Sequence, residues 1–272
     1  MKEQLTVVKV GGAVVEDEQK LQQLLTHFSQ IPGHKVLVHG GGRSATQIAS
    51  RLGIESQMVQ GRRITDSEML QVVTMVYGGL VNKNLVARLQ AVGVNALGLT
   101  GADMNVLRSR RRPPVQMSLK DETTGETRHE MVDFGYVGDV YQADGHCLQA
   151  LIAQGITPVM APLTHDGAGH ILNTNADTIA AETAKALAPF FDVTLIYSFE
   201  KPGVLADPDD DRSLIPAINR QSFAEYVERG VISGGMIPKI ENALNAISCG
   251  VSKVIITLAT AIDGRHGTII TE

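Results

Sequence analysis

The sequence predicts an α/β fold, a three-layer αβα sandwich around a mainly parallel, open sheet. Short runs rich in Val, Ile and Leu alternate along the chain with stretches of helical periodicity. Alternating strands and helices typically build a parallel sheet whose two faces are both covered by helices. The six strand-like runs are residues 5–10, 35–39, 94–99, 156–160, 193–197 and 253–257.

Helices are expected between these strands. The apolar stripes that predict them lie in residues 21–28, 45–52, 223–227 and 237–244. Thr65 and Glu68 form a capping-box pattern that predicts a helix start, and Gly230 predicts a helix end. The segment 108–140 breaks the alternation with two prolines and polar alternation around residues 123–125, which predicts a β-hairpin.

Composition and charge limit the classes of function. The chain has 272 residues, enough for one large domain or two small lobes, and a formal net charge of −5 without a basic tail. This charge argues against nucleic acid as the main partner, and no apolar run is long enough to span a membrane. Two distant cysteines suggest no disulfide framework, and no secretory signal is evident. We therefore expect a soluble, cytoplasmic protein.

Polar clusters follow four predicted strands, and ligands bind at such strand ends in open α/β sheets. Lys9 precedes a glycine pair, glycines 40–42 follow the second strand, Asp177 begins an alanine-rich helix, and Lys239 lies near another helix start. Glycines let backbone N–H groups approach phosphate oxygens. Lysines supply compact positive charges for a transferring phosphoryl group. Together these residues fit phosphoryl transfer, which depends on positioning and charge neutralisation.

Structural alternatives exist for each of these residues taken singly. Lys9 alone fits a surface lysine, and Asp177 alone fits a helix N-terminal charge. His39 fits a packed residue at a strand end, and of the adjacent Arg62 and Arg63 at most one points inward. The arginines within 108–112 most simply form a solvated turn. The P-loop motif, a G-x-G-x-x-G after the first strand and metal-ligand spacings are all missing from the sequence.

Several motifs occur in one order along nearly the whole chain, and together they resemble the amino acid kinase superfamily and, within it, the N-acetylglutamate kinases. The combination of G-x-R-[IV]-T-D with N-x-N-A-D and G-G-M-[IV]-x-K carries the specificity of this resemblance. The motifs are VVKVGGA, VLVHGGGR, GRRITD, LTGAD, VDFGYVGDV, LNTNADTIAAE and GGMIPKIENAL.

The resemblance implies catalytic roles for three residues. Lys9 and Lys239 match lysines that stabilise charge on the transferring phosphoryl group. Asp177 matches the acid that lies between those lysines and orients them.

The resemblance also implies the residues that bind the acyl substrate. Gly12, Gly41 and Gly42 match glycines whose N–H groups approach the phosphoryl group and the substrate. Arg63 matches an arginine that holds a substrate carboxylate, and Asn173 matches an asparagine that binds the acylated amino acid.

Two lobes are implied in the same way: residues 1–188 for acyl-glutamate binding and dimerisation, and residues 189–272 for nucleotide binding. The family's nucleotide turn usually has the pattern S/T-D-V-x-G-[IV]-L, whereas this chain has YSFEKPGVL, with one added residue and an acid that is either shifted or replaced. The residues expected at the nucleotide are Ser198, Glu200, Lys201, Gly203, Val204, Leu205, Ile232 and Ser233.

The implied reaction is phosphorylation of the γ-carboxylate of an N-acyl-L-glutamate by ATP in arginine biosynthesis. N-acetyl-L-glutamate is the expected substrate, and N-succinyl-L-glutamate or a non-catalytic amino-acid sensor are the alternatives. Mg²⁺ is expected to arrive with the ATP phosphates, without a dedicated metal site on the protein.

A homodimer is the expected assembly. In the resembling family, arginine-inhibited members carry an extra N-terminal helix that interlocks dimers into hexamers, and here only four residues precede the first strand. We therefore also expect no feedback inhibition by L-arginine. The candidate interface includes one side of the helix after Thr65, formed by Leu70, Val73, Tyr77 and Leu80. Packing of this side against the sheet of the same subunit is the alternative.

Overall fold

The computed structural model describes residues 2–120 and 127–272 of the chain. The polar turn expected at residues 123–125 lies outside the described residues.

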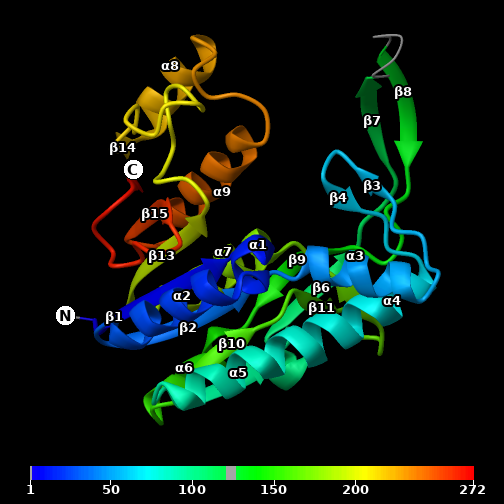
Figure 1. Ribbon diagram of the computed structural model, residues 1–272, viewed down its shortest axis with the longest axis horizontal. Helices are drawn as coiled ribbons and strands as arrows, with labels where there is room; N and C mark the ends of the chain where they lie inside the picture. The colour runs from blue at the N-terminus through cyan, green and yellow to red at the C-terminus, as the bar shows by residue number, and fades with distance from the viewer. Residues whose placement is uncertain (1, 121–126) are drawn as a thin grey trace.

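An eight-stranded sheet forms the centre of the protein (Figure 1), with the strand order β14-β16-β15-β13-β1-β2-β10-β5. All six expected runs are strands of this sheet, and they pair with one another in parallel. One edge is mixed, because β16 runs antiparallel to β15. The strands are β1 (Gln4–Val10), β2 (His34–His39), β5 (Ala96–Leu99), β10 (Thr157–Met160), β13 (Asp192–Phe199), β14 (Ala217–Ile218), β15 (Lys253–Leu258) and β16 (Thr268–Ile270).

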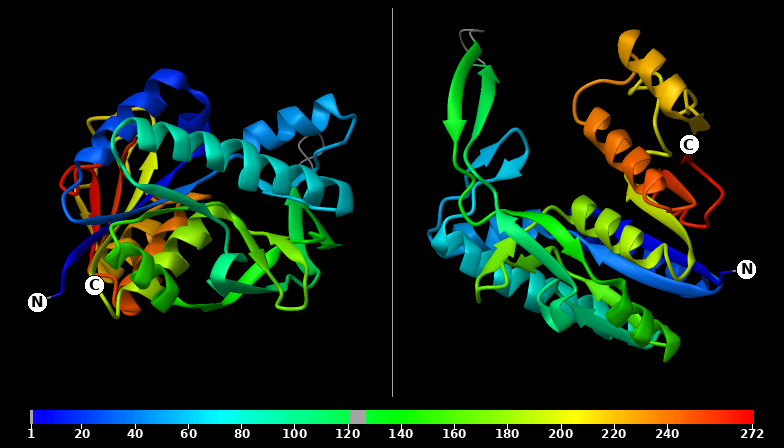
Figure 2. Two further views of the ribbon diagram at one scale, coloured as in Figure 1. Left: turned by 90° about the horizontal axis from the view of Figure 1, so that it is seen from below. Right: turned by 180° about the vertical axis from the view of Figure 1, so that it is seen from behind.

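Helices cover both faces of this sheet, which confirms the three-layer prediction (Figure 2). Successive residues of a strand point to opposite faces. Leu5 and Val7 of β1 accordingly pack in one core with α6, α7 and α9, whereas Val8 and Val10 pack in the other with α2 to α5. The helices are α1 (Gly12–Glu16), α2 (Glu18–Gln30), α3 (Gly42–Arg51), α4 (Ser67–Val73), α5 (Asn82–Ala91), α6 (Gly145–Ala153), α7 (Ala176–Leu187), α8 (Arg220–Glu228) and α9 (Met236–Ser248).

The helix after Thr65 starts differently from the prediction. Asp66 is its N-cap and accepts a hydrogen bond from the Met69 backbone N at 2.8 Å. The Thr65 hydroxyl instead accepts a hydrogen bond from Asn173 Nδ2 at 2.9 Å. The predicted capping box of Thr65 with Glu68 is therefore wrong, because the neighbouring aspartate takes the capping role while the threonine binds across the fold.

A π-helical segment, η1 (Thr74–Val81), joins α4 to α5 in this region. The apolar periodicity of the sequence predicted a helix here but did not distinguish the π-helical form. The segment turns Tyr77 inward, and this side chain is 5% exposed. Segments of this kind often occur at functional sites.

Two hairpins and a smaller sheet occupy the end of the molecule opposite α8 and α9 (Figure 1). The predicted excursion is confirmed as an antiparallel hairpin of β7 with β8. A shorter hairpin of β3 with β4 lies beside it, and Gln60 Nε2 donates to the Ser118 carbonyl at 2.9 Å. The remaining elements are β3 (Met58–Val59), β4 (Arg62–Arg63), the 3₁₀ turn Asp103–Asn105, β6 (Leu107–Arg111), β7 (Val115–Lys120), β8 (Thr127–Val132), β9 (Gly138–Ala143), β11 (Leu163–His165) and β12 (Ile171–Asn173).

No helix among residues 2–120 and 127–272 is long and apolar enough to cross a membrane.

Candidate active site

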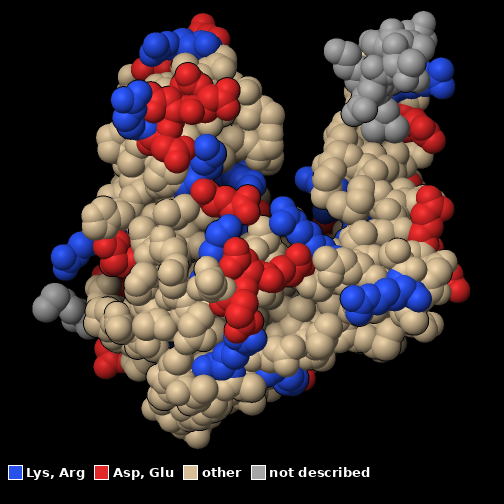
Figure 3. All heavy atoms as spheres, viewed as in Figure 1, with Lys and Arg blue, Asp and Glu red and all other residues tan. Residues whose placement is uncertain are grey.

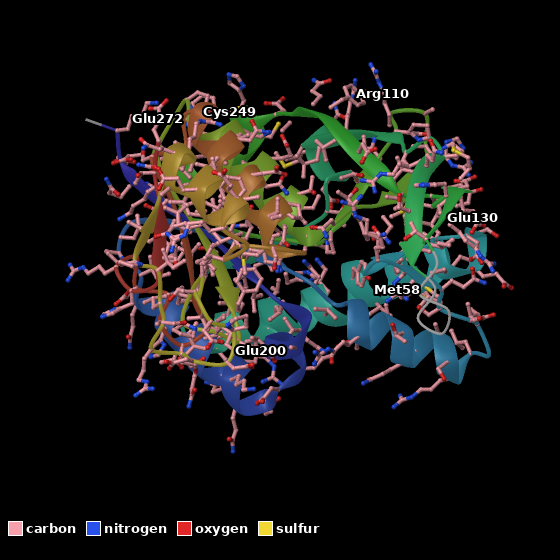
Figure 4. The ribbon with its side chains drawn as sticks, turned by 90° about the horizontal axis from the view of Figure 1, so that it is seen from above. Met58, Arg110, Glu130, Glu200, Cys249 and Glu272 are labelled. Atoms are coloured by element: carbon pink, nitrogen blue, oxygen red, sulfur yellow. The ribbon has the colours of Figure 1, made fainter. Side chains whose placement is uncertain are left out.

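The polar clusters that follow the strands converge on one open cavity of about 800 Å³. Figure 3 shows this face of the molecule hollowed between the two projecting arms, with Lys and Arg side chains gathered near the base of the hollow. Figure 4 shows Met58 of β3 and Glu130 of β8 on one side of the molecule and Glu200, just beyond β13, on the other. The sequence-predicted residues that line the cavity are Gly41, Gly42, Arg63, Asn173, Asp177 and Lys239.

The glycine turns after β1 and β2 face each other beside this cavity. A Cβ atom on Gly12 would lie 3.7 Å from the backbone N atoms of Gly41 and Gly42, and one on Gly40 would lie 3.2 Å from the Gly12 N. Gly41 is the N-cap of α3, and within the described chain no side chain caps that helix end. The first N–H groups of α3 are therefore available to an anionic group in the cavity.

Lys9 and Asp177 form an ion pair at the base of the site. The Lys9 Nζ lies 2.7 Å from Asp177 Oδ1, and the two side chains are 10% and 18% exposed. The Asn175 side chain caps α7 by accepting from the Asp177 backbone N at 2.7 Å, which places Asp177 in the first turn of the helix. Lys9, from the end of β1, is thus held at the cavity's edge by a carboxylate from a different element.

Lys239 projects from the first turn of α9 toward the same place. Burial lowers the pKa of Lys239 below its usual value, and the positive charge of Lys9 adds to this effect, while the negative charge of Asp177 opposes it. In the described part of the chain, no carboxylate lies within ion-pair distance of Lys239, whose Nζ lies 3.9 Å from the centre of the Phe199 ring. Asp177 was expected to lie between the two lysines and orient them. In this structure it forms an ion pair with Lys9, whereas it acts on Lys239 through its charge, beyond ion-pair distance.

Arg63 is buried and Arg62 is exposed, which agrees with the expectation that at most one of these adjacent arginines points inward. Arg63 Nη2 donates to the Gly42 carbonyl and to Thr46 Oγ1, each at 2.8 Å. Its Nη1 donates to Ser56 Oγ and, at 3.8 Å, to the Met69 thioether sulfur. All four acceptors are neutral, and no acidic partner of Arg63 is found among the residues that the structure describes. The guanidinium charge therefore remains uncompensated at the cavity wall.

Asn173 and Tyr77 complete this wall. Asn173 is 9% exposed, and its Nδ2 donates to Thr65 Oγ1, which fixes the orientation of the amide. The Tyr77 ring lies against Gly41, where a Cβ atom would be 3.0 Å from Tyr77 Cδ1. Burial raises the pKa of the Tyr77 hydroxyl, and the nearby Arg63 opposes this shift. Glycine at position 41 leaves the room that the ring needs.

The residues expected at the nucleotide are not part of the cavity lining. Ser198 is fully buried, and its hydroxyl donates to the Lys9 carbonyl at 3.0 Å, so this side chain joins β13 to β1. Lys201 is exposed and forms an ion pair with Asp211 at 2.9 Å. A Cβ atom on Gly203 would lie 2.5 Å from Leu214 Cδ1, which indicates that this glycine is needed for packing.

The other members of this expected set are divided by their exposure. Val204, Leu205 and Ile232 are buried. Glu200 and Ser233 are exposed. Gly234 and Gly235, which follow Ser233 and precede α9, do line the cavity.

His39 is fully buried beneath the glycine turn, as expected for a packed residue. Its Nδ1 bonds the Gly40 carbonyl at 2.8 Å, and its Nε2 lies 3.1 Å from Asn82 Nδ2. This pattern fits a neutral ring that donates through Nδ1 and accepts at Nε2. Burial lowers the pKa of His39 to about 4.

Three residues of the site were missed or misplaced by the sequence analysis. Arg112 was expected in a solvated turn, yet it follows strand β6, lines the cavity and pairs with Asp139. Tyr77 was assigned to a dimer interface, yet it is buried within the subunit and lines the cavity. Phe199 is part of the unusual YSFEKPGVL turn, so a signal for its special position was present in the sequence.

Comparison with protein families gives a match over most of the chain. Residues 4–258 match the model of the amino acid kinase family.

Individual relatives align with this chain over nearly their whole lengths. The chain is 64% identical over 270 residues to a protein of Phocaeicola vulgatus named acetylglutamate kinase, covering 99% of both chains. It is 61% identical to a protein of the same name from Parabacteroides distasonis, covering 98% of both chains. Among solved structures, smu.665 from Streptococcus mutans superimposes with a TM-score of 0.74 at 28% identity, over 98% of both chains.

Proposed function

The chain belongs to the amino acid kinase family, and we propose that it transfers the γ-phosphoryl group of ATP to the γ-carboxylate of N-acetyl-L-glutamate. The products are ADP and the acyl phosphate, an intermediate of arginine biosynthesis. The observation that carries this proposal is the Lys9–Asp177 ion pair, which lies with Lys239 at the edge of the cavity that Arg63 and Asn173 line. One cavity thus offers positive charge for a phosphoryl group and fixed polar groups for a small dicarboxylate.

The chemistry requires little beyond positioning and charge. The γ-carboxylate of the substrate is ionised at neutral pH, so no general base is needed to activate it. Lys9 and Lys239 neutralise negative charge that the two reacting anions bring together, while Asp177 holds the Lys9 ammonium in place. The N–H groups at the start of α3 act on the same charge from the side of the glycine turn.

Arg63 and Asn173 orient the acyl-glutamate in this proposal. The weakest of the four acceptors around Arg63 is the Met69 thioether. A substrate carboxylate is a much stronger acceptor, so exchange of the thioether for a carboxylate favours binding. Asn173, fixed by Thr65, offers its amide to the acylated end of the substrate.

ATP approaches from the side of residues 189–272, where Gly234 and Gly235 at the start of α9 line the cavity. Residues 1–188 then form the lobe that binds the acyl-glutamate. Mg²⁺ arrives as part of the nucleotide substrate, because this ion commonly keeps waters and phosphate oxygens as ligands. We place the enzyme in the cytoplasm, where ATP is supplied.

A homodimer is part of the same proposal, with its interface at the edge of the sheet formed by β5. Of the stripe expected from the sequence, Val73 and Tyr77 are buried inside the subunit and are not available to a partner. Met75 and Leu80 on η1 are 56% and 50% exposed, and Leu97 on the edge strand β5 is 38% exposed. These three apolar side chains are the surface that a second copy would cover.

N-succinyl-L-glutamate is the alternative substrate, and one observation bears on it. Arg62 is exposed, lines the same cavity and has no acidic partner in the described part of the chain. A succinyl group would bring a third carboxylate, for which Arg62 is a suitable cation. A non-catalytic sensor is less well supported, because lysines that act on a transferring phosphoryl group have no use in a protein that only binds a ligand.

Trapping of the acyl phosphate tests the proposed function. Purified protein with ATP, Mg²⁺ and N-acetyl-L-glutamate should give a hydroxamate when hydroxylamine is present, with ADP formed in equal amount. N-succinyl-L-glutamate serves as the comparison substrate. A higher kcat/KM for the succinyl compound, with that preference lost in Arg62→Ala, would favour the alternative, and binding of both ligands without hydroxamate would favour the sensor.

A further inference from the structure

Phe199, the last residue of β13, lies against both lysines of the proposed active site. Its ring centre is 3.9 Å from Lys239 Nζ and 5.4 Å from Lys9 Nζ. An ammonium group within about 6 Å of a ring centre is attracted to the negative face of the aromatic ring. The ring is therefore the group that holds the ammonium of Lys239, for which no ion pair is found within the described chain.

The register of the sheet explains why the ring and the lysines meet. Lys9 of β1 is paired with Tyr197 of the parallel strand β13. Phe199 lies two residues beyond Tyr197, so the side chains of Phe199, Tyr197 and Lys9 are all on the same face of the sheet. The two rings stack with centres 6.4 Å apart, and the Ala259 N–H donates to the Phe199 carbonyl at 3.0 Å. The ring is thus held from its own strand and from the strand beside it.

An aromatic ring holds a cation differently from a carboxylate. A carboxylate partner neutralises the charge that it positions, as Asp177 does for Lys9. A ring face attracts the ammonium through its quadrupole but carries no net charge. Phe199 therefore fixes the position of the Lys239 ammonium before the substrate arrives without placing a further negative charge beside it.

We propose that Phe199 is a positioning residue for Lys239, orienting its ammonium group by a cation–π contact in place of an ion pair. This inference rests on the proposed function, in which Lys239 acts on the transferring phosphoryl group. It assigns a reason to the departure of YSFEKPGVL from the usual nucleotide turn: the aromatic residue at the strand end serves the lysine pair.

Matched substitutions separate the ring face from apolar bulk. Phe199→Leu keeps an apolar side chain but removes the π system, and Phe199→Tyr keeps it. We expect Phe199→Leu to lower kcat about tenfold, within the range of a partly desolvated cation–π contact, with both KM values within about twofold. Phe199→Tyr, which keeps the aromatic ring, should have a kcat close to that of the wild type. Phe223→Leu on α8 is the control for loss of a phenylalanine elsewhere.

A second readout does not depend on the reaction. Lysine protons over an aromatic face experience a ring-current shift to high field, so NMR of protein with ¹³C-labelled lysine reports the contact directly. The Lys239 signal, identified by its loss in Lys239→Arg, should be shifted in the wild type and in Phe199→Tyr and should return to the ordinary position in Phe199→Leu.

Defined results would overturn the proposal. Wild-type kcat in Phe199→Leu, or a change confined to the KM of ATP, would show that the ring does not position Lys239 for the reaction. An unshifted Lys239 signal in the wild type would show that the contact does not form. If the wild-type protein forms no acyl phosphate, the proposed function fails, and the NMR comparison still decides whether Phe199 holds Lys239.

Discussion

Replacement of Arg63 by lysine tests how the substrate is held. The change keeps the positive charge at the cavity wall but removes the planar fork that binds a carboxylate through two parallel hydrogen bonds. Arg63 is buried and in contact with the glycine turn, donating to the Gly42 carbonyl at 2.8 Å. Lysine at this position offers one ammonium nitrogen, which cannot form two parallel hydrogen bonds to a carboxylate.

The expected magnitude follows from one lost hydrogen bond to a charged group. Such a bond contributes about 1.5–3 kcal/mol, and each 1.4 kcal/mol corresponds to about a factor of ten. The KM for N-acetyl-L-glutamate in Arg63→Lys should therefore rise by about 10- to 150-fold. The KM for ATP should stay within about threefold, because Arg63 lies on β4, across the cavity from α9.

The assay is steady-state kinetics with each substrate varied in turn, and Arg62→Lys is the matched control. Arg62 is the exposed neighbour, so the same substitution there should leave the KM for N-acetyl-L-glutamate within about twofold. Urea unfolding confirms that each variant is folded, since Arg63 also braces Thr46 of α3. An equal rise in the KM of ATP for both variants would refute this assignment of the arginine and of the substrate side.

Three further predictions concern stability and assembly. Asp177→Asn should lower the free energy of unfolding by about 3 kcal/mol in urea melts, because it leaves the largely buried Lys9 ammonium without its partner, and unchanged stability would contradict the ion pair. The pKa of His39 is lowered from 6.5 to about 4 by burial. Between these two pH values the His39 side chain is protonated in the unfolded chain and neutral in the folded protein. The free energy of unfolding should therefore fall by up to about 3 kcal/mol as the pH drops from 6.5 to 4. In urea melts of His39→Gln, the decrease over the same pH range should be smaller by this amount. Leu80→Glu should convert a homodimer into monomers in light scattering, and a monomeric wild type would exclude the proposed interface.

The sheet was predictable because its strands are buried on both faces. Residues 36–38 and 254–256 are continuous apolar runs, a pattern typical of central parallel strands. Helix starts were harder to predict, since Thr65 and Asp66 both favour an N-cap. Tertiary contact with Asn173 decides between them, and no local pattern contains that contact. The apolar periodicity likewise did not distinguish the π-helical turn at Thr74–Val81 from an α-helix.

In the candidate site, too, some features were predictable from the sequence and others were not. Lys9, Asp177 and Lys239 come from three distant segments, and the rule that ligands bind at strand ends was enough to group them. The resemblance implied Asp177 as the acid between the two lysines, but no pattern in the sequence predicted the contact of Phe199 with Lys239. Asp177 pairs with Lys9 alone, and Phe199 holds Lys239, because the register of β13 against β1 sets which side chains meet.

Turnover of two lysine variants tests most directly the claim that Lys9 and Lys239 act on the transferring phosphoryl group. Lys9→Ala and Lys239→Ala are compared with the wild type by hydroxamate trapping, with ATP and N-acetyl-L-glutamate at saturation. Each variant should lose about two to three orders of magnitude in kcat, as expected for removal of a group that stabilises transition-state charge. Near-normal kcat in both variants would contradict the account.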